Sequence, residues 1–265
     1  MLDNFVIGDY IVTWFQIIIV ITVILLSLFS IWINKHDNNI LLSKYSFVII
    51  PSYVIICTLI GFVGARLLAF MEIAIVNNNN YHTNNWTYNT LVQNVYGESW
   101  YGGFILVAII VVIFSGIKLS KEKRIYFLNY NGILVTLAYI LGRQACFISA
   151  DGCYGIPTNH PFGMRFLHGI KPTLLTVHPT PLYESITHVI IFILLFRIRK
   201  MRNYIPVALF LILSGSSRFF IEFIRTNPRI LFNLSMAQII SVLMFIMGAI
   251  ILFNQLNLKF VYHEK

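Results

Sequence analysis

Seven apolar runs constrain this chain more than any other feature, because each is close to the ~20 residues that cross a bilayer. They lie near residues 10–33, 47–71, 101–117, 127–149, 182–197, 204–224 and 234–254, and the third and fifth are the shortest. Lipid offers the backbone no hydrogen-bond partner, so such runs are expected to be helices. We predict an all-α polytopic membrane protein with about seven transmembrane helices, forming a single integral membrane domain over residues 1–265.

The composition supports this class and excludes others. The chain is 58% hydrophobic and only 11% charged, with a mean hydropathy of +0.77, which is too apolar for a soluble globule. The net charge of +9 could suggest a nucleic-acid partner, but no basic helix or basic arm with interleaved aromatic residues occurs. No positive charge precedes the first run, so we interpret it as a retained spanning helix and not as a secretory signal.

The lysines and arginines predict an orientation. Twelve of the 19 lie in the connections after the first, third, fifth and seventh runs: Lys35, Lys44, Lys118, Lys121, Lys123, Arg124, Arg197, Arg199, Lys200, Arg202, Lys259 and Lys265. The opposite side has only Arg165, Lys171, Arg225 and Arg229. Because cytoplasmic loops are enriched in basic residues, the N-terminus is predicted outside and the C-terminus in the cytoplasm.

Two long loops are predicted on the outer, periplasmic side, near residues 77–100 and 150–181. The Asn-rich patch from Asn77 to Asn80 is typical of a solvated loop. The stretch from Gly142 to Glu184 is rich in glycine and proline and cannot be one continuous helix or strand. We therefore expect an irregular loop region above the outer ends of the helices.

Three arginines lie inside apolar runs, where a charge costs about 2.5 to 3.5 kcal/mol at the bilayer centre. Arg66, Arg143 and Arg218 belong to the second, fourth and sixth runs, and each lies toward the outer end. Glu184 and Glu222 are expected at the same depth. One arginine could snorkel to the interface as an anchor. Three from alternate helices, together with two glutamates, favour a shared polar cavity in the outer half of the bilayer.

Such a cavity suggests a ligand and a chemistry. Guanidinium groups match phosphate oxygens bidentately, so a phospholipid head group is the expected ligand. A reaction on the lipid would also need a group that takes up or delivers a proton, and Glu184, His178, Tyr101 and Glu222 are the candidates. The GxSxG, HExxH and glycine-rich phosphate-loop motifs do not occur.

The cysteines do not predict a cofactor. Cys57, Cys146 and Cys153 form no CxxC pair, and we favour their interpretation as packing residues. A disulfide between Cys146 and Cys153 is the alternative interpretation if these two residues face an oxidising compartment. The histidines of the Gly142–Glu184 stretch, taken with Cys146, Cys153 and Asp151, match no metal-ligand spacing, so neither a metal nor a cofactor is expected.

Six motifs resemble the prolipoprotein diacylglyceryl transferase family of bacterial inner-membrane enzymes in their order and spacing. They are GARLLAF (64–70), WYGGFI (100–105), GRQACFISADGCYGIPT (142–158), VHPTPLYE (177–184), SRFFIEFIR (217–225) and SMAQIIS (235–241). The resemblance covers most of the chain. It implies transfer of the diacylglyceryl group of phosphatidylglycerol to the lipobox cysteine in the signal peptide of a prolipoprotein, the first step of lipoprotein maturation. The product is a thioether, glycerol phosphate leaves, and a monomer is expected.

The resemblance also implies roles for individual residues. The family's signature arginine, which grips phosphatidylglycerol, falls on Arg143, and its second essential arginine falls on Arg218. A free thiol has a pKa of about 8.5, so its attack needs a base or a positive pocket. The candidate catalytic residues are Tyr101, Glu184, His178 and Arg218, and the candidate substrate-binding residues are Arg143, Arg66, Arg218, Gly102, Gly103, Asp151 and Glu222.

The sequence departs from the family pattern in two places. The usual HGG appears as Tyr101, Gly102 and Gly103, and the usual GNFING reads ACFISADG, with Cys146 in place of an asparagine. The chain resembles a variant branch in which YGG, CF and HPTPLYE occur together. Tyrosine, with a pKa of about 10, is a poor base but a good hydrogen-bond donor. Two alternatives stay open: a related phospholipid-using transferase with another acceptor, and a non-catalytic lipid-binding membrane protein.

Overall fold

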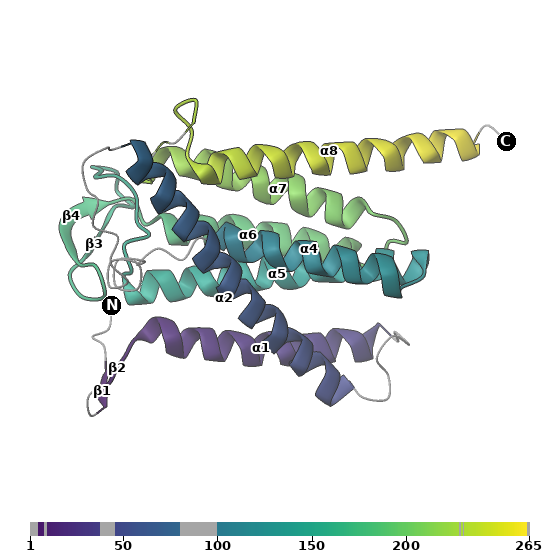
Figure 1. Cartoon of the computed structure of the whole chain (residues 1–265), viewed down its shortest axis with the longest axis horizontal. Helices are drawn as coiled ribbons and strands as arrows, with labels where there is room; N and C mark the ends of the chain where they lie inside the picture. Colours follow the sequence, from purple (N-terminus) through teal and green to yellow (C-terminus); the bar gives the residue numbers. More distant parts are fainter. Residues whose placement is uncertain are drawn as a thin grey trace.

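The structure, a computed structural model, describes residues 5–7, 10–37, 46–79, 100–227, 229 and 231–263. Within this part of the chain, seven helices are long and apolar enough to cross a membrane, as predicted. They are α1 (Trp14–His36), α2 (Ser46–Asn79), α4 (Trp100–Lys118), α5 (Lys121–Ser149), α6 (Thr180–Ile198), α7 (Ile205–Ile221) and α8 (Met236–His263) (Figure 1). The third and fifth runs both form full helices of 19 residues.

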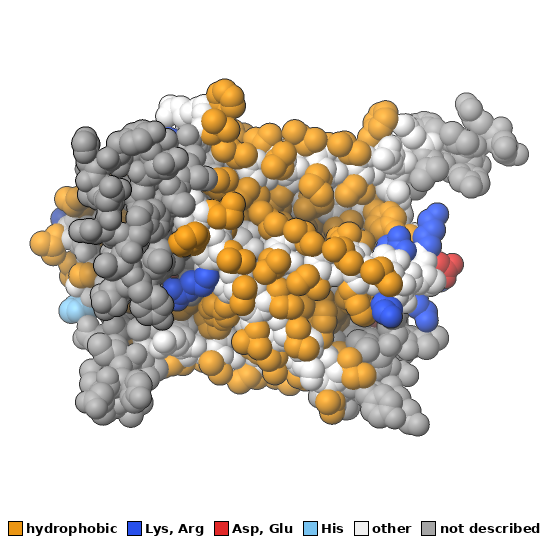
Figure 2. All heavy atoms as spheres, viewed as in Figure 1, with side chains coloured by type: hydrophobic (Ala, Val, Ile, Leu, Met, Phe, Trp, Pro, Cys, Tyr) orange, Lys and Arg blue, Asp and Glu red, His pale blue; other side chains and the backbone are white. Residues whose placement is uncertain are grey.

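The helices form a bundle whose centre is α5 and α6. Helix α1 packs on α5, α7 packs on α6 and α8, and α2 crosses the bundle diagonally to pack on α4 (Figure 1). Ile133, Leu195 and Phe210 form a buried core between α5, α6 and α7. Apolar side chains cover the middle of the visible face, while lysine and arginine side chains gather where α4 leads into α5 (Figure 2). This distribution suits a surface that contacts lipid.

The start of the first helix differs from the prediction. Helix α1 begins at Trp14 and not at residue 10, because Thr13 caps it: the Thr13 side chain accepts a hydrogen bond from the Gln16 N–H, and the Gln16 side chain accepts one from the Thr13 N–H. The preceding residues form an antiparallel pair of short strands, β1 (Phe5–Ile7) and β2 (Tyr10–Val12).

Helices α2, α5 and α8 extend beyond the apolar runs that predicted them, and α8 continues to His263, nine residues past its run. Helix α2 continues to Asn79, so the prediction of a loop from Asn77 onward was wrong for residues 77–79; no glycine or proline stops the helix there. Helix α5 begins at Lys121, six residues before the predicted start, because its first turns are polar and continue beyond the apolar segment. Residues 80–99, which hold most of the first predicted outer loop, lie outside the described part of the chain.

The second predicted outer loop, residues 150–181, is not irregular throughout. It contains an antiparallel pair, β3 (Met164–Phe166) and β4 (Thr173–Val177), and Val177 also bridges to Pro157. This small sheet lies beyond the end of the bundle where α5 ends and α6 begins (Figure 1). It therefore covers the end at which the intramembrane charges were predicted.

Glycines allow α2 and α4 to approach closely. A Cβ atom on Gly102 would overlap the carbonyl oxygen of Gly64, and a Cβ on Gly103 would lie 2.7 Å from the carbonyl oxygen of Gly61. Both positions in α4 therefore require the absence of a side chain. The contact fixes the start of α4 and with it Tyr101.

Candidate active site

Charged side chains from three helices and one loop converge at the end of the bundle where α5 ends and α6 begins. Arg143 lies two turns before the end of α5, Glu184 lies at the start of α6, and Arg218 lies in the last turn of α7. Glu222 follows in the 3₁₀ helix η2 (Glu222–Ile224), and Arg225 comes directly after it. Arg218, Glu222 and Arg225 are four and then three residues apart, which is the spacing of one helix face.

Glu184 is the centre of this cluster and is fully buried. Its Oε2 lies 2.5 Å from Nε of Arg143, and its Oε1 pairs with Nη1 of Arg218. Nη1 of Arg225 lies 3.3 Å from the same Oε1. One carboxylate therefore orients three guanidinium groups.

Glu222 is a second, equally buried anchor. Its Oε2 lies 3.0 Å from Nη2 of Arg218 and 3.6 Å from Nε of Arg225. Its Oε1 accepts hydrogen bonds from Nδ2 of Asn227 (2.6 Å) and from the hydroxyl of Ser235 (2.8 Å). Several partners share this carboxylate, so their combined ion pairs and hydrogen bonds offset the free-energy cost of burying its charge.

The cluster carries one surplus positive charge when both carboxylates are ionised, since three arginines face two glutamates. The side chains of Arg143, Arg218 and Arg225 each keep 8% of their surface exposed, whereas those of Glu184 and Glu222 have none. The accessible surface of the cluster thus belongs to its arginine side chains. Such a surface can bind an anion.

Two aromatic residues that the sequence analysis did not single out support Arg143. The Arg143 guanidinium lies over the Tyr139 ring, 4.8 Å from its centroid, and the His188 ring lies 4.1 Å from that of Tyr139. Nδ1 of His188 donates to the carbonyl oxygen of Glu184 at 2.9 Å. His188 therefore links the first turns of α6 to the packing around Arg143.

Tyr101 is buried and acts as a hydrogen-bond donor. Its hydroxyl lies 2.7 Å from Oγ of Ser241 on α8. The Ser241 hydroxyl already donates its only proton to the carbonyl oxygen of Ala237, so Tyr101 supplies the proton between the two hydroxyls. This bond ties α4 to α8 beside the cluster.

His178 follows β4 and is half-buried. Its Nδ1 lies 3.3 Å from the Tyr183 hydroxyl. Its carbonyl oxygen accepts the Gly155 N–H at 2.8 Å, and the next residue, Ile156, donates to the carbonyl oxygen of Ile224 at 2.9 Å. The 155–156 segment therefore separates His178 from the backbone that precedes Arg225.

A second group of reactive side chains adjoins Arg143. The ligand atoms of Cys146, Asp151 and Cys153 all lie within 4.8 Å of one another. Nη1 of Arg143 donates to the Cys146 sulfur at 3.8 Å, and Oδ1 of Asp151 accepts the Cys153 N–H at 2.9 Å. Burial raises the pKa of Asp151 to about 7. All three cysteines of the chain are free thiols.

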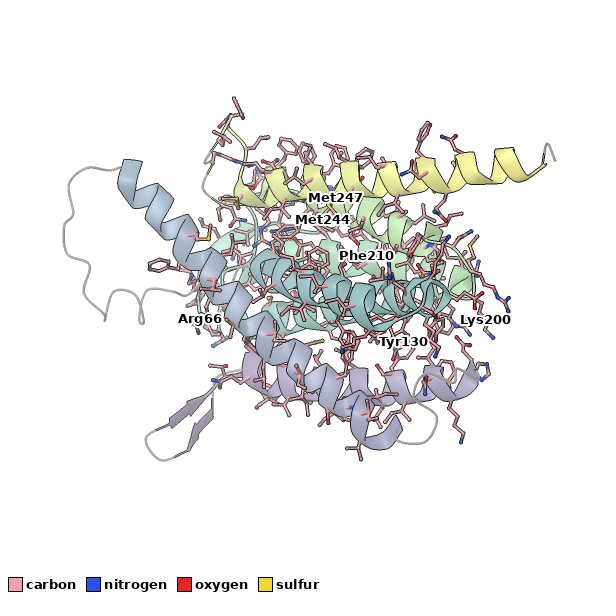
Figure 3. The ribbon with its side chains drawn as sticks, turned by 45° about the vertical axis from the view of Figure 1, so that its right-hand side comes forward. Arg66, Tyr130, Lys200, Phe210, Met244 and Met247 are labelled. Carbon is pink, nitrogen blue, oxygen red and sulfur yellow. The ribbon has the colours of Figure 1, made fainter. Side chains whose placement is uncertain are left out.

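The structure brings together most of the charged residues that the sequence singled out. Arg143, Arg218, Glu184 and Glu222 form one cluster, and Asp151 adjoins it through Cys146. Arg66 lies on α2 with an exposed side chain (Figure 3). Gly102 and Gly103 contact α2, as described above.

Arg225 is the main residue that sequence reasoning missed. It was counted among the charges of an outer loop because it follows the sixth apolar run. Its distance of seven residues from Arg218, two helical turns, is the signal that could have placed both on one face.

The candidate spanning helices and the buried arginine–glutamate cluster define a multi-pass membrane protein with charged side chains inside one end of its helix bundle. The chain belongs to the prolipoprotein diacylglyceryl transferase family, whose model matches residues 4–254. Together with the seven candidate spans, this places the protein in the bacterial inner membrane.

Individual relatives of the chain are named as enzymes of the same family. A phosphatidylglycerol–prolipoprotein diacylglyceryl transferase of Finegoldia magna is 34% identical over 161 residues, which cover 58% of this chain and 60% of the relative. One from Clostridioides difficile is 38% identical over 143 residues, covering 52% and 55%. One from Wolbachia pipientis is 27% identical over 267 residues, covering 97% and 95%. The first two matches thus span less than two thirds of those relatives.

Proposed function

We propose that this protein transfers the diacylglyceryl group of phosphatidylglycerol to the cysteine thiol of a prolipoprotein signal peptide. The observation that carries the proposal is the buried cluster in which Arg143, Arg218 and Arg225 share two glutamates. Relatives that are named for this activity support it. In this proposal the chain is a monomer and a single membrane domain, with the cluster near the outer face.

The charge of the cluster suits this lipid. Phosphatidylglycerol carries one phosphodiester charge, and the cluster has one surplus positive charge. The phosphate would bind at the accessible surface of the cluster, where Arg143 and Arg218 have fixed orientations. The same groups would stabilise the charge that develops on the leaving glycerol phosphate. Stabilisation of developing charge by donors that are already oriented is usually the largest single contribution to an enzyme's rate.

The bond changes assign the remaining roles. The thiol sulfur forms a bond to the glycerol carbon, and the bond from that carbon to the phosphate oxygen breaks, leaving its electron pair on glycerol phosphate. The thiol proton needs an acceptor. Glu184 is engaged by three arginines and Tyr101 donates to Ser241, so both are positioning residues in this proposal. His178, half-buried and linked through the 155–156 segment to the backbone before Arg225, is the proposed proton acceptor.

The test is transfer in proteoliposomes that contain phosphatidylglycerol and a lipobox peptide. The expected result is a thioether-linked diacylglyceryl peptide, detected by mass spectrometry, with a loss of at least about 100-fold for Arg143→Ala. Arg165→Ala, an exposed arginine of the outer loop, is the matched control and should retain activity. A well-folded parent protein that binds phosphatidylglycerol but forms no thioether would contradict the proposal and favour another acceptor.

A further inference from the structure

We infer that Cys146 and Cys153 form a redox-reactive dithiol that closes to an intramolecular disulfide beside Arg143. Neither thiol has a role in the proposed transfer reaction. The two residues occupy the junction between α5 and the loop that follows it, where the Cys146 sulfur contacts the Arg143 guanidinium that binds the lipid phosphate in that proposal.

The backbone brings the two sulfurs together. Cys146 lies in the last turn of α5, and Ala150 ends the helix in the left-handed conformation, with φ of 46°. This reversal folds Cys153 back over the helix end, where Asp151 fixes it by accepting its N–H. The sulfurs lie within 4.8 Å, so side-chain rotation can bring them to the ~2.05 Å of a disulfide.

The surroundings activate one of the two thiols. The pKa of Cys153 is lowered well below the usual thiol value, chiefly because Cys146 hydrogen bonds to it and also because Arg225 and Arg143 lie nearby. The thiolate is the nucleophile in disulfide exchange. Both thiols are half-buried, and Cys153, which has the lowered pKa, is the member of the pair that would attack.

The same three ligand atoms could also hold a metal ion, but the charges favour a disulfide. Nη1 of Arg143 already contacts the Cys146 sulfur, so a divalent cation at the cluster would face a guanidinium at short range. A disulfide is neutral and places no further positive charge there. The basic loops lie at the opposite end of the bundle, which puts the pair on the outer side, where disulfides persist.

The chemical step balances with a disulfide as oxidant, either a small-molecule disulfide or a disulfide-exchange protein of the outer compartment. The Cys153 thiolate attacks one sulfur of that disulfide and releases one thiolate, which leaves a mixed disulfide. The Cys146 sulfur then displaces the second thiolate and loses its proton. Two electrons pass to the oxidant, whose sulfurs end as two thiols.

The experiment counts thiols in the full-length protein in its membrane. Samples are equilibrated with oxidised or with reduced glutathione, quenched in acid, denatured, alkylated and analysed as intact protein and as peptides. In the oxidised sample we expect only Cys57 to be alkylated and the 146–153 peptide to lack two hydrogens. In the reduced sample all three cysteines should be alkylated.

Matched variants make the result specific. Cys57→Ser, on α2 and outside the cluster, should leave the disulfide intact. In the oxidised sample Cys146→Ser should stop at the mixed disulfide, with one glutathione on Cys153, whereas Cys153→Ser should leave Cys57 and Cys146 alkylated. Three alkylated cysteines in the oxidised parent protein would overturn the inference. So would one equivalent of bound zinc in the parent that is lost in Cys153→Ser. Neither readout uses transfer activity, so failure here is separate from failure of the proposed function.

Discussion

Glu184 orients three guanidinium groups with one carboxylate, so its charge is the first property to test. We expect Glu184→Gln to destabilise the protein by about 3 kcal/mol, because removal of one partner from a buried ion pair leaves the others uncompensated. Transfer activity should fall about 100-fold as the arginines lose their orientation. Thermal unfolding in detergent and initial rates in proteoliposomes measure the two effects.

The matched control is Glu122→Gln, since Glu122 is exposed in the first turn of α5. It should change neither stability nor rate by more than the scatter of a surface substitution, about 0.5 kcal/mol. Equal effects of the two substitutions would contradict the role of Glu184 in orienting the arginines.

His178 is the residue whose substitution tests the proton step. We expect His178→Gln to lower kcat/KM about 100-fold at neutral pH, because general base catalysis contributes on this scale. The loss should shrink as pH rises, since the thiol then ionises without help. His160→Gln, an exposed neighbour in the same loop, should behave like the parent protein. An unchanged pH–rate profile in His178→Gln would assign the proton to another group.

The Cys153 thiol allows a prediction about pH. Because its pKa is lowered, its thiolate is present below the ~8.5 at which an ordinary thiol ionises, so alkylation at pH 6.5 should be at least about tenfold faster than that of a free peptide thiol. Cys146→Ala removes the hydrogen bond that contributes most to the lowering, so the Cys153 rate at pH 6.5 should fall. Mass spectrometry of timed alkylation measures both rates.

At this scale the sequence predicts charges better than contacts. Arg143 and Arg218 could be predicted because a charge within an apolar run is costly and therefore informative. Arg225 could not be separated from ordinary loop charges, because it follows the end of its run. The approach of Cys146 to Cys153 depends on the left-handed conformation of Ala150. The sequence does not predict this conformation, because residue 150 is neither glycine nor asparagine.

At the scale of elements, the contact between α2 and α4 depends on glycines. We expect Gly102→Ala to destabilise the protein by about 1 to 3 kcal/mol, because the added Cβ would overlap the Gly64 carbonyl oxygen and the Leu68 side chain. Gly116→Ala in the same helix has no atom near the new Cβ and should be neutral or stabilising by up to about 1 kcal/mol. Thermal unfolding of both variants in one detergent compares them, and a larger loss for Gly116→Ala would contradict the packing argument.

The apolar runs predicted every spanning helix but not where each one ends. A run shows where lipid contact requires apolar side chains, whereas a helix continues until a cap or a breaker stops it. This is why α5 begins six residues before its run, at Lys121, and why α1 begins later than its run, after the cap at Thr13. The pair β3 and β4 was missed because short strands in a glycine- and proline-rich stretch leave little periodicity to detect.

At the scale of the whole molecule, the two ends of the bundle use charge differently. At one end Asp37 joins α1 to the end of α6, with Nε of Arg199 at 3.0 Å and Nζ of Lys200 at 3.2 Å. At the other end the arginines converge on Glu184 inside the bundle. Arg66 and Lys200 lie toward these opposite ends (Figure 3). The sequence could predict this division from charge counts, but not the diagonal path of α2, which depends on its packing on α4.

The orientation of the bundle can be tested with alkaline phosphatase fusions, because this enzyme is active only where its disulfides form. We expect the enzyme to be active when it is inserted after Gly163, in the predicted outer loop, and inactive when it is inserted after Ser120, between α4 and α5, with the rest of the chain following it in both fusions. Replacing Lys118, Lys121, Lys123 and Arg124 by glutamine removes one of the two largest groups of basic residues on the predicted cytoplasmic side and should raise the activity of the Ser120 fusion, whereas replacing the lysines by arginine should not. Activity of the Ser120 fusion without any substitution would reverse the orientation, and the arginine cluster would then face the cytoplasmic leaflet.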